Sequence, residues 1–213
     1  MFDFLTKRIG FACKYMHYDQ TLPPKLLENI QRPYNGKTST ISSLSKMDKV
    51  LAYEKIRDIV IHNISSYDNL IEYVATLPKE RHMLRLGSEL CPGYTHNSIK
   101  EFYCNPELIN ILGVGLSKIG EKAKEYDIRL SMHPGQFVAI VSENQNVVER
   151  SLSDLEYHAD IAEYMGFGSE FQNFKINIHL SGKHGTNGFE SIFTRMSQRL
   201  RNMLTIENDE FSK

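Results

Sequence analysis

Short apolar runs alternate along the chain with longer stretches in which apolar residues recur at helical spacing. The runs predict strands near residues 8–13, 83–87, 129–133, 174–180 and 202–207. The clearest helices are predicted over about 106–126, which Asn105 caps, and about 147–165, which Gly166 ends. Strands that alternate with helices in this way are typical of α/β proteins with a parallel sheet.

The interval between the first two predicted strands is longer and less regular. Its sequence predicts a proline-rich entry at 22–24, a loop over 36–43, a helix over about 44–61 and another helix before Pro78. A last helix is predicted to begin near Phe189. We find no internal repeat, low-complexity tract or linker, and therefore expect a single domain over residues 1–213.

Three of the predicted strands carry a residue that could bind a metal ion. The third ends in His133, the fourth contains His179 and the fifth ends in Glu207. In each strand the apolar side chains have one parity and the ligand-type residue has the other, so these residues can all point inward in a closed parallel barrel. Chemistry in such folds lies at the carboxyl ends of the strands. A carboxylate that points inward is costly unless it is paired or binds metal, so the pattern predicts a metal pocket.

Composition and charge narrow the class of protein. The chain has 213 residues, of which 41% are hydrophobic and 24% charged, as in ordinary globular proteins. A net charge of −1 gives no overall electrostatic argument for nucleic acid binding, although Lys and Arg can gather locally around a site. No secretory signal and no run of about 18 apolar residues is found. We therefore expect a cytoplasmic protein with no membrane partner.

Six short motifs in order along the chain carry a family resemblance. They are Arg8-Ile9-Gly10-Phe11-Ala12-Cys13, Leu84-Arg85-Leu86-Gly87-Ser88, Leu130-Ser131-Met132-His133-Pro134-Gly135-Gln136, Val147-Val148-Glu149-Arg150-Ser151-Leu152, Ile178-His179-Leu180 and Ile206-Glu207-Asn208-Asp209-Glu210. Together they resemble the UV damage endonuclease family, metal-dependent nucleases that incise DNA beside photoproducts. The resemblance implies a TIM-barrel-type (β/α) fold. Eight strands close such a barrel, and about five of the eight β/α units are predicted here, so we expect an incomplete barrel with its C-terminal strands missing.

The same resemblance implies the chemistry. Two or three divalent ions, often manganese, are expected, with His133 and His179 as metal ligands and Glu207 as a bridging, catalytic carboxylate. Imidazole and carboxylate ligands suit manganese or zinc. The implied reaction is hydrolysis of the DNA strand on the 5′ side of a UV photoproduct, which starts excision repair. His96 matches a family histidine near the active site and is expected to act in catalysis, as a phosphate contact or in the metal surroundings.

Other matching residues are expected to probe the damaged duplex. Gln136 and Phe137 match the family's pair of lesion-probing residues, and Phe11 and Tyr15 also stand at lesion-probing positions. The family usually has Tyr where this chain has Phe11 and Phe137, and often Asn at Tyr15, so stacking should survive while some polar contacts are lost. Poorly stacked photoproducts lower the cost of inserting such a wedge, so damaged double-stranded DNA is the expected partner.

Two alternatives remain open at this stage. A sugar isomerase of the same wide barrel group could use similar His and Glu ligands. A truncated product could instead bind DNA or a protein partner without cutting, because the family's remaining metal ligands and a catalytic lysine have no counterpart here. We expect weak or absent activity from this chain alone, and a separately encoded C-terminal segment could complete the sheet. The sequence does not indicate an oligomeric state.

Overall fold

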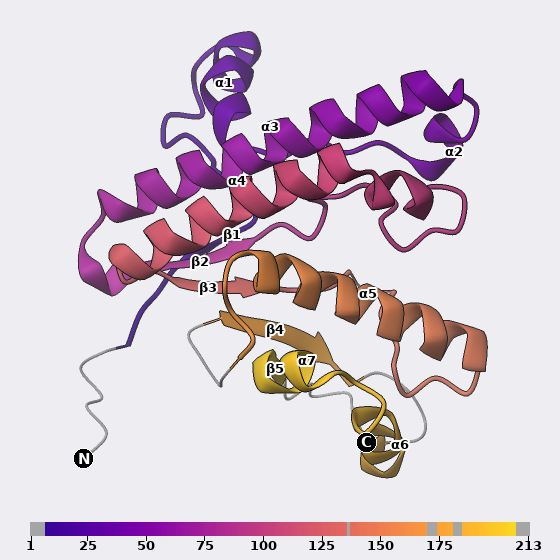
Figure 1. Ribbon diagram of the computed structural model, residues 1–213. Coiled ribbons are helices and arrows are strands. Elements are labelled where there is room, and N and C mark those ends of the chain that lie inside the picture. The colour runs from indigo at the N-terminus through magenta and orange to yellow at the C-terminus, as the bar shows by residue number, and fades with distance from the viewer. Residues whose placement is uncertain (1–6, 136, 170–173, 181–184, 208–213) are drawn as a thin grey trace. The chain divides into compact units, whose positions relative to one another are not determined.

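The computed structural model describes residues 7–135, 137–169, 174–180 and 185–207 (Figure 1). Its five strands are β1 (Phe11–Ala12), β2 (Met83–Leu86), β3 (Arg129–Met132), β4 (Phe174–His179) and β5 (Leu204–Glu207). They form one sheet in the order β1-β2-β3-β4-β5, and the β1–β2 and β4–β5 pairs are parallel. The predicted α/β class with about five strands is confirmed, and each predicted strand is present, although β1 is shorter than expected.

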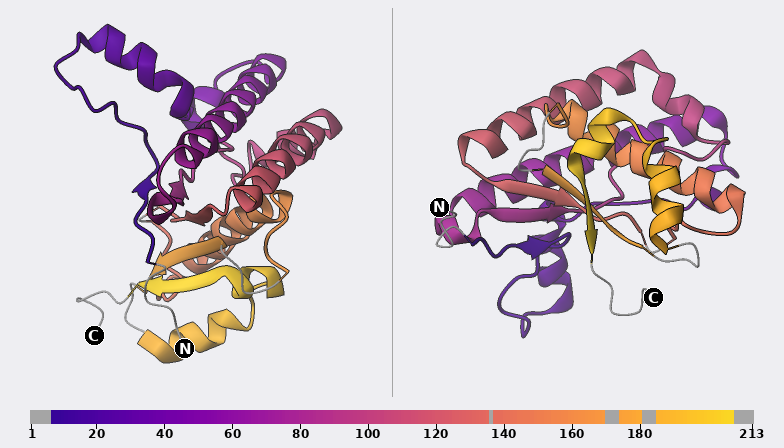
Figure 2. Two further views of the ribbon diagram at one scale, coloured as in Figure 1. Left: turned by 90° about the vertical axis from the view of Figure 1, so that its left-hand side faces the viewer. Right: turned by 90° about the horizontal axis from the view of Figure 1, so that it is seen from below.

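The chain divides into two compact units, Met1–Leu130 and Ser131–Lys213. In the first unit, two long helices, α3 (Lys49–Ala75) and α4 (Pro106–Glu125), pack side by side in all views (Figures 1 and 2). Shorter elements complete this unit: α1 (Pro24–Gln31), η2 (Arg32–Tyr34), α2 (Ile41–Leu44), η3 (Lys79–Arg81) and η4 (Lys100–Cys104).

Helix α3 corrects our prediction of two helices before Pro78. The Asp48 side chain accepts a hydrogen bond from the main-chain N–H of Val50 and begins the helix at Lys49. No Gly or Pro interrupts the following 27 residues, so a single helix forms, and buried side chains recur along its whole length. The predicted loop over 36–43 is also interrupted, because Thr40 caps the short helix α2.

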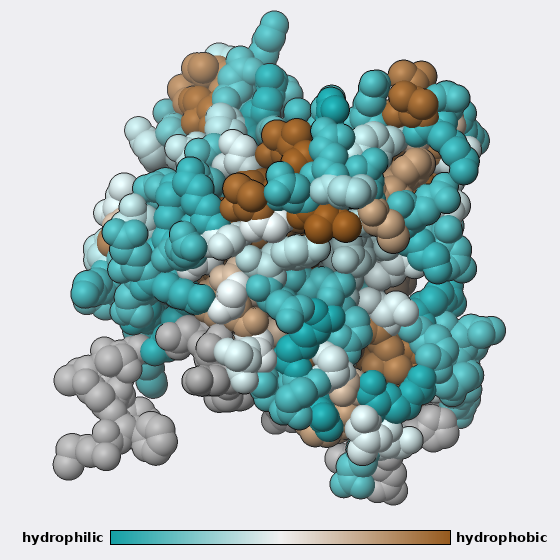
Figure 3. Space-filling view, in the orientation of Figure 1, coloured by the Kyte–Doolittle hydropathy of each residue, from teal (hydrophilic) through white to brown (hydrophobic). Residues whose placement is uncertain are grey.

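The core of the first unit lies where α3 and α4 meet the sheet. Leu84 and Leu86 of β2 are fully buried, as are Ile56 of α3 and Leu116 of α4. On the outer side, Figure 3 shows hydrophobic side chains gathered over the same two helices. The large apolar residues exposed on these helices are Val50, Leu51, Ile61, Ile109 and Val114.

The second unit holds α5 (Gln145–Tyr164), α6 (Gly185–Phe193) and α7 (Gln198–Met203) together with β4 and β5. Helix α5 contacts both β4 and α7, and α7 runs directly into β5. We expected one helix from about Phe189; instead the chain breaks after α6, because Ser197 is extended and its side chain caps α7 at the N–H of Leu200. No helix of the described residues is long and apolar enough to cross a membrane.

Candidate metal centre

Three strand ends of the second unit supply the candidate ligands. His133 follows the last residue of β3, while His179 and Glu207 are the last residues of β4 and β5. Cα register pairs His179 with Glu207, so the two side chains lie on the same face of adjacent strands. On β4, Ile176 and Ile178 of the opposite parity are buried, as predicted.

The geometry brings the three side chains together around the carboxylate. Glu207 Oε1 lies 3.4 Å from His133 Nε2, and Glu207 Oε2 lies 3.3 Å from His179 Nδ1. The two imidazole rings are 4.9 Å apart between centroids and tilted by 55°. One ligand atom from each of the three residues lies within 4.8 Å of the others. Atoms bound to one ion at about 2.0–2.2 Å cannot lie more than about 4.4 Å apart, so small side-chain adjustments bring all three within reach of a shared ion.

A hydrogen-bonded chain orients the carboxylate. Asn177 Nδ2 donates to Glu207 Oε1, and Thr205 Oγ1 donates to Asn177 Oδ1 at 3.0 Å. Asn177 and Thr205 are themselves register partners on β4 and β5. Sequence reasoning missed both residues, yet they have the same odd parity as His179 and Glu207. A search for polar side chains of that parity would have found them.

Another hydrogen bond fixes the tautomer of His133. Its Nδ1 lies 2.8 Å from the main-chain oxygen of Pro134. A carbonyl oxygen can only accept, so Nδ1 carries the proton in this bond and Nε2 presents a lone pair. The lone pair is on the atom that faces Glu207, which is the arrangement that a metal-binding histidine requires.

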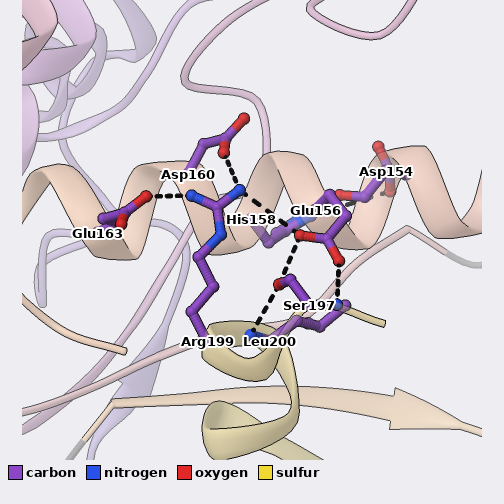
Figure 4. Close-up of polar contacts among 8 residues, drawn as sticks. All are labelled: Asp154, Glu156, His158, Asp160, Glu163, Ser197, Arg199 and Leu200. Atoms are coloured by element: carbon purple, nitrogen blue, oxygen red, sulfur yellow. Dashed lines mark hydrogen bonds and ion pairs between the residues drawn. The ribbon is translucent and has the colours of Figure 1, made fainter. Parts of the chain in front are cut away.

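Helix α7 leads into the start of β5, and Arg199 ties it to α5 (Figure 4). The Arg199 guanidinium pairs with Glu163, with Asp160 and, at 3.5 Å, with Glu156. Glu156 also accepts hydrogen bonds from the N–H and hydroxyl of Ser197, both at 2.8 Å. These contacts anchor the helix that immediately precedes β5 and Glu207.

Next to this network, His158 is buried in α5, as its place on the predicted apolar stripe indicated. Its Nδ1 lies 2.6 Å from the main-chain oxygen of Asp154. Burial lowers the pKa of His158 and raises that of the Asp154 carboxyl, so it acts against the charged form of each group.

The other predicted site residues lie outside this ligand group. His96 is exposed in the first unit, with Nδ1 2.8 Å from Ser98 Oγ. Gln136 lies outside the described residues, and Phe137 is 84% exposed. Their roles in catalysis and lesion probing stay predictions.

Phe11 and Tyr15 belong to an aromatic cluster of the first unit. The Tyr15 ring packs on Tyr34 at 4.6 Å and on the edge of Tyr73 at 5.1 Å between centroids. Phe11 contacts the same Tyr73 ring at 6.1 Å. Both residues are half-buried, so their rings support the fold, and their role in lesion probing stays a prediction.

Comparison with known proteins agrees with this architecture. The family model described as UV-endonuclease UvdE matches residues 7–212. The chain is 26% identical over 180 residues to the UV DNA damage endonucleases of Bacillus mycoides (strain KBAB4) and Bacillus cereus (strain ATCC 10987 / NRS 248), covering 82% of this chain and 54% of each relative. The chain therefore spans about half the length of these curated relatives.

A solved structure shares the fold. The protein in "Crystal Structure of SacUVDE" is 26% identical, and the match covers 96% of this chain and 62% of that one with a TM-score of 0.74. This likeness confirms the expected TIM-barrel-type (β/α) fold.

Proposed function

Because this chain belongs to the UV-endonuclease UvdE family, we propose that it acts in DNA repair as a metal-dependent endonuclease. In this proposal it recognises UV photoproducts and related distortions in double-stranded DNA and hydrolyses the phosphodiester on the 5′ side of the lesion. The observation that carries the proposal is the convergence of His133, His179 and Glu207, with ligand atoms within 4.8 Å of one another.

The donor set fits divalent ions of the manganese class. Two imidazoles and one carboxylate are the ligand types that suit manganese or zinc, and no thiolate is present in the group. His133 Nε2, a ring nitrogen of His179 and the Glu207 oxygens would hold the ions, of which we propose two or three in the complete site. When bound, such ions activate water and neutralise charge on the attacked phosphate.

The chain's own residues prepare this site. The Asn177 amide holds one oxygen of Glu207, and the Pro134 carbonyl keeps the His133 lone pair on Nε2. We propose that Phe137, exposed a few residues beyond His133, and Gln136 probe the duplex, and that Phe11, Tyr15 and His96 contribute from the first unit. An exposed ring can occupy the space of displaced bases without a penalty for leaving a packed core.

The direct test is nicking of supercoiled plasmid. With Mn²⁺ we expect UV-irradiated plasmid to be nicked in preference to unirradiated plasmid, weakly or not at all by this chain alone and clearly once added C-terminal strands complete the barrel. His133→Ala and Glu207→Gln are expected to abolish this nicking. Glu190→Gln, a change of an exposed acid in α6, serves as the matched control. Equal nicking by His133→Ala would refute the metal role. Binding of irradiated duplex without any nicking would favour the alternative of a DNA-binding fragment.

A further inference from the structure

The segment of residues 7–37, here called the basic arm, differs in charge from the rest of the chain. It contains six Lys or Arg residues and only two Asp or Glu residues, in a chain whose net charge is −1. The arm comprises β1, the loop that follows it, α1 and η2. Figure 2 shows α1 standing out from α3 and α4 in both views.

Most of the positive charge of the basic arm is exposed and has no acidic partner. Among the described residues, four exposed lysines of the arm form no ion pair: Lys7, Lys14, Lys25 and Lys37. The two acids of the arm do not offset them. Glu28 pairs with Arg32 at 3.2 Å, and Asp19 accepts hydrogen bonds from the N–H and hydroxyl of Thr21.

The loop that carries Lys14 is held in one conformation by its own arm. The N–H of Tyr15 donates to Asn35 Oδ1 at 2.8 Å, and Asn35 Nδ2 donates back to the main-chain oxygen of Tyr15 at 3.0 Å. The N–H of His17 donates to Gln31 Oε1 at 2.9 Å. Ring packing of Tyr15 on Tyr34 closes the same loop. Loss of conformational freedom on binding is therefore small.

This rigid loop presents apolar side chains to solvent. Tyr18 is 90% exposed and Met16 is 70% exposed. Tyr15, which precedes them in the sequence, instead packs in the aromatic cluster. The rings of His17 and Tyr18 pack on each other with centroids 4.4 Å apart. An almost fully exposed tyrosine in an arm that also carries exposed lysines without ion pairs suits a polyanion that carries flat rings.

We propose that the basic arm is a lesion-independent contact surface for the DNA duplex, in which Lys14, Lys25 and Lys37 bind backbone phosphates and Tyr18 packs against a sugar or base. Lysines that neutralise phosphates supply affinity without reading sequence, and an aromatic ring adds contact with any nucleotide. The arm thereby supplies general affinity for duplex DNA. This inference rests on the proposed function, since it takes the same duplex as its ligand.

Salt dependence of binding tests the lysines. Anisotropy of a fluorescein-labelled, undamaged duplex is titrated with the full chain in EDTA at several NaCl concentrations. Each lysine that contacts a phosphate contributes about 0.9 to the slope of log K against log salt concentration. We therefore expect the double variant Lys14→Ala/Lys25→Ala to reduce the slope by about 1.8. The control Lys100→Ala/Lys118→Ala, which removes two exposed lysines outside the arm, should leave it unchanged. Equal slopes for the arm variant and the wild type would overturn the proposal.

Tyr18 is tested separately, because an almost fully exposed ring can be removed without loss of the fold. We expect Tyr18→Ala to weaken duplex binding about five-fold or more and Tyr18→Phe to retain most of the affinity. Unchanged duplex binding by Tyr18→Ala would show that Tyr18 is not part of the DNA contact surface.

These measurements need no cleavage, so the two proposals can fail separately. If irradiated plasmid is nicked but the lysine variant shows no change of slope, the proposed function stands and the basic arm is refuted as a DNA contact surface. The opposite result, a changed slope without nicking by the completed barrel, keeps the DNA contact of the basic arm and contradicts the proposed nuclease function.

Discussion

The side-chain amide of Asn177 donates a hydrogen bond to Glu207 across the β4–β5 pair, and Asn177 lies two residues before His179, the register partner of Glu207. Asn177 is in turn held by the hydroxyl of Thr205 at 3.0 Å. The central carboxylate of the candidate metal centre is therefore oriented by a neutral amide, which brings no positive charge of its own to the site. The N–H donor of an amide restricts the carboxylate to one orientation, and it does not compete with the carboxylate as a ligand of the ion.

We predict that Asn177→Ala weakens Mn²⁺ binding about 10- to 100-fold, as is usual when a group that orients a metal ligand is lost. Isothermal titration calorimetry with MnCl₂ measures this directly. Asn110→Ala, which removes an exposed amide from α4, is the matched control and should bind Mn²⁺ like the wild type. Unchanged affinity in a folded Asn177→Ala protein would show that the amide does not support the site.

The Arg199 network makes a prediction about stability. In Arg199→Ala the carboxylates of α5 lose their shared cation, and those of Glu156, Asp160 and Glu163 then repel one another (Figure 4). Because the Arg199 side chain is only 29% exposed, we expect a loss of about 1–2 kcal/mol in the free energy of unfolding, measured in urea. Arg195, which pairs with Glu149, is more exposed. Arg195→Ala should therefore lower the free energy of unfolding by less than about 1 kcal/mol. Equal losses for the two variants would contradict the shared-cation argument.

A pH dependence follows from the ion pair between Arg8 and Asp127 in the first unit. The hydrogen bond from the Arg8 guanidinium lowers the pKa of the Asp127 carboxyl below its usual value. The pair therefore stabilises the fold at neutral pH, and this contribution is lost as the pH falls from about 4 through the lowered pKa. Asp127→Asn should cost less than about 1 kcal/mol at pH 7, because the carboxylate is half exposed, and the difference from the wild type should vanish in acid.

Urea unfolding midpoints between pH 7 and pH 2.5 measure that difference. Asn tolerates the positive φ of 53° at this position, so the substitution removes charge with little backbone strain. A difference that persists unchanged in acid would show that the effect is not ionic.

Strand periodicity predicted the convergence of the three candidate ligands because it is a local property of each strand. His179 and Glu207 meet since both have the same parity on neighbouring strands, and no long-range information was needed beyond the parallel order. Tyr15 is the opposite case. Its ring packs on Tyr34 and Tyr73, which are 19 and 58 residues away in the sequence, and no pattern around Tyr15 indicates these contacts.

Helix boundaries likewise separate what neighbours in the sequence determine from what distant contacts determine. The start of α4 follows from Asn105, whose side chain caps the helix as the sequence predicted. Our division of α3 into two helices was wrong, because its polar residues near the middle include Asn63, which is buried by contacts with distant loops rather than placed at a helix end. Capping is readable from neighbours in sequence, whereas burial of a polar side chain depends on tertiary partners.

Asn63 carries the last prediction. Its Oδ1 accepts from the N–H of Lys37 at 2.6 Å, and its Nδ2 donates to the main-chain oxygens of Lys37 and Leu90 at 2.9 and 3.1 Å. One buried amide thus joins the segments that follow β1 and β2. Asn63→Ala leaves these main-chain groups without partners, and we expect it to cost about 2–4 kcal/mol in urea unfolding. The control Asn69→Ala loses one exposed bond to Pro33 and should cost less than about 1 kcal/mol, so similar losses for both variants would refute the role of Asn63.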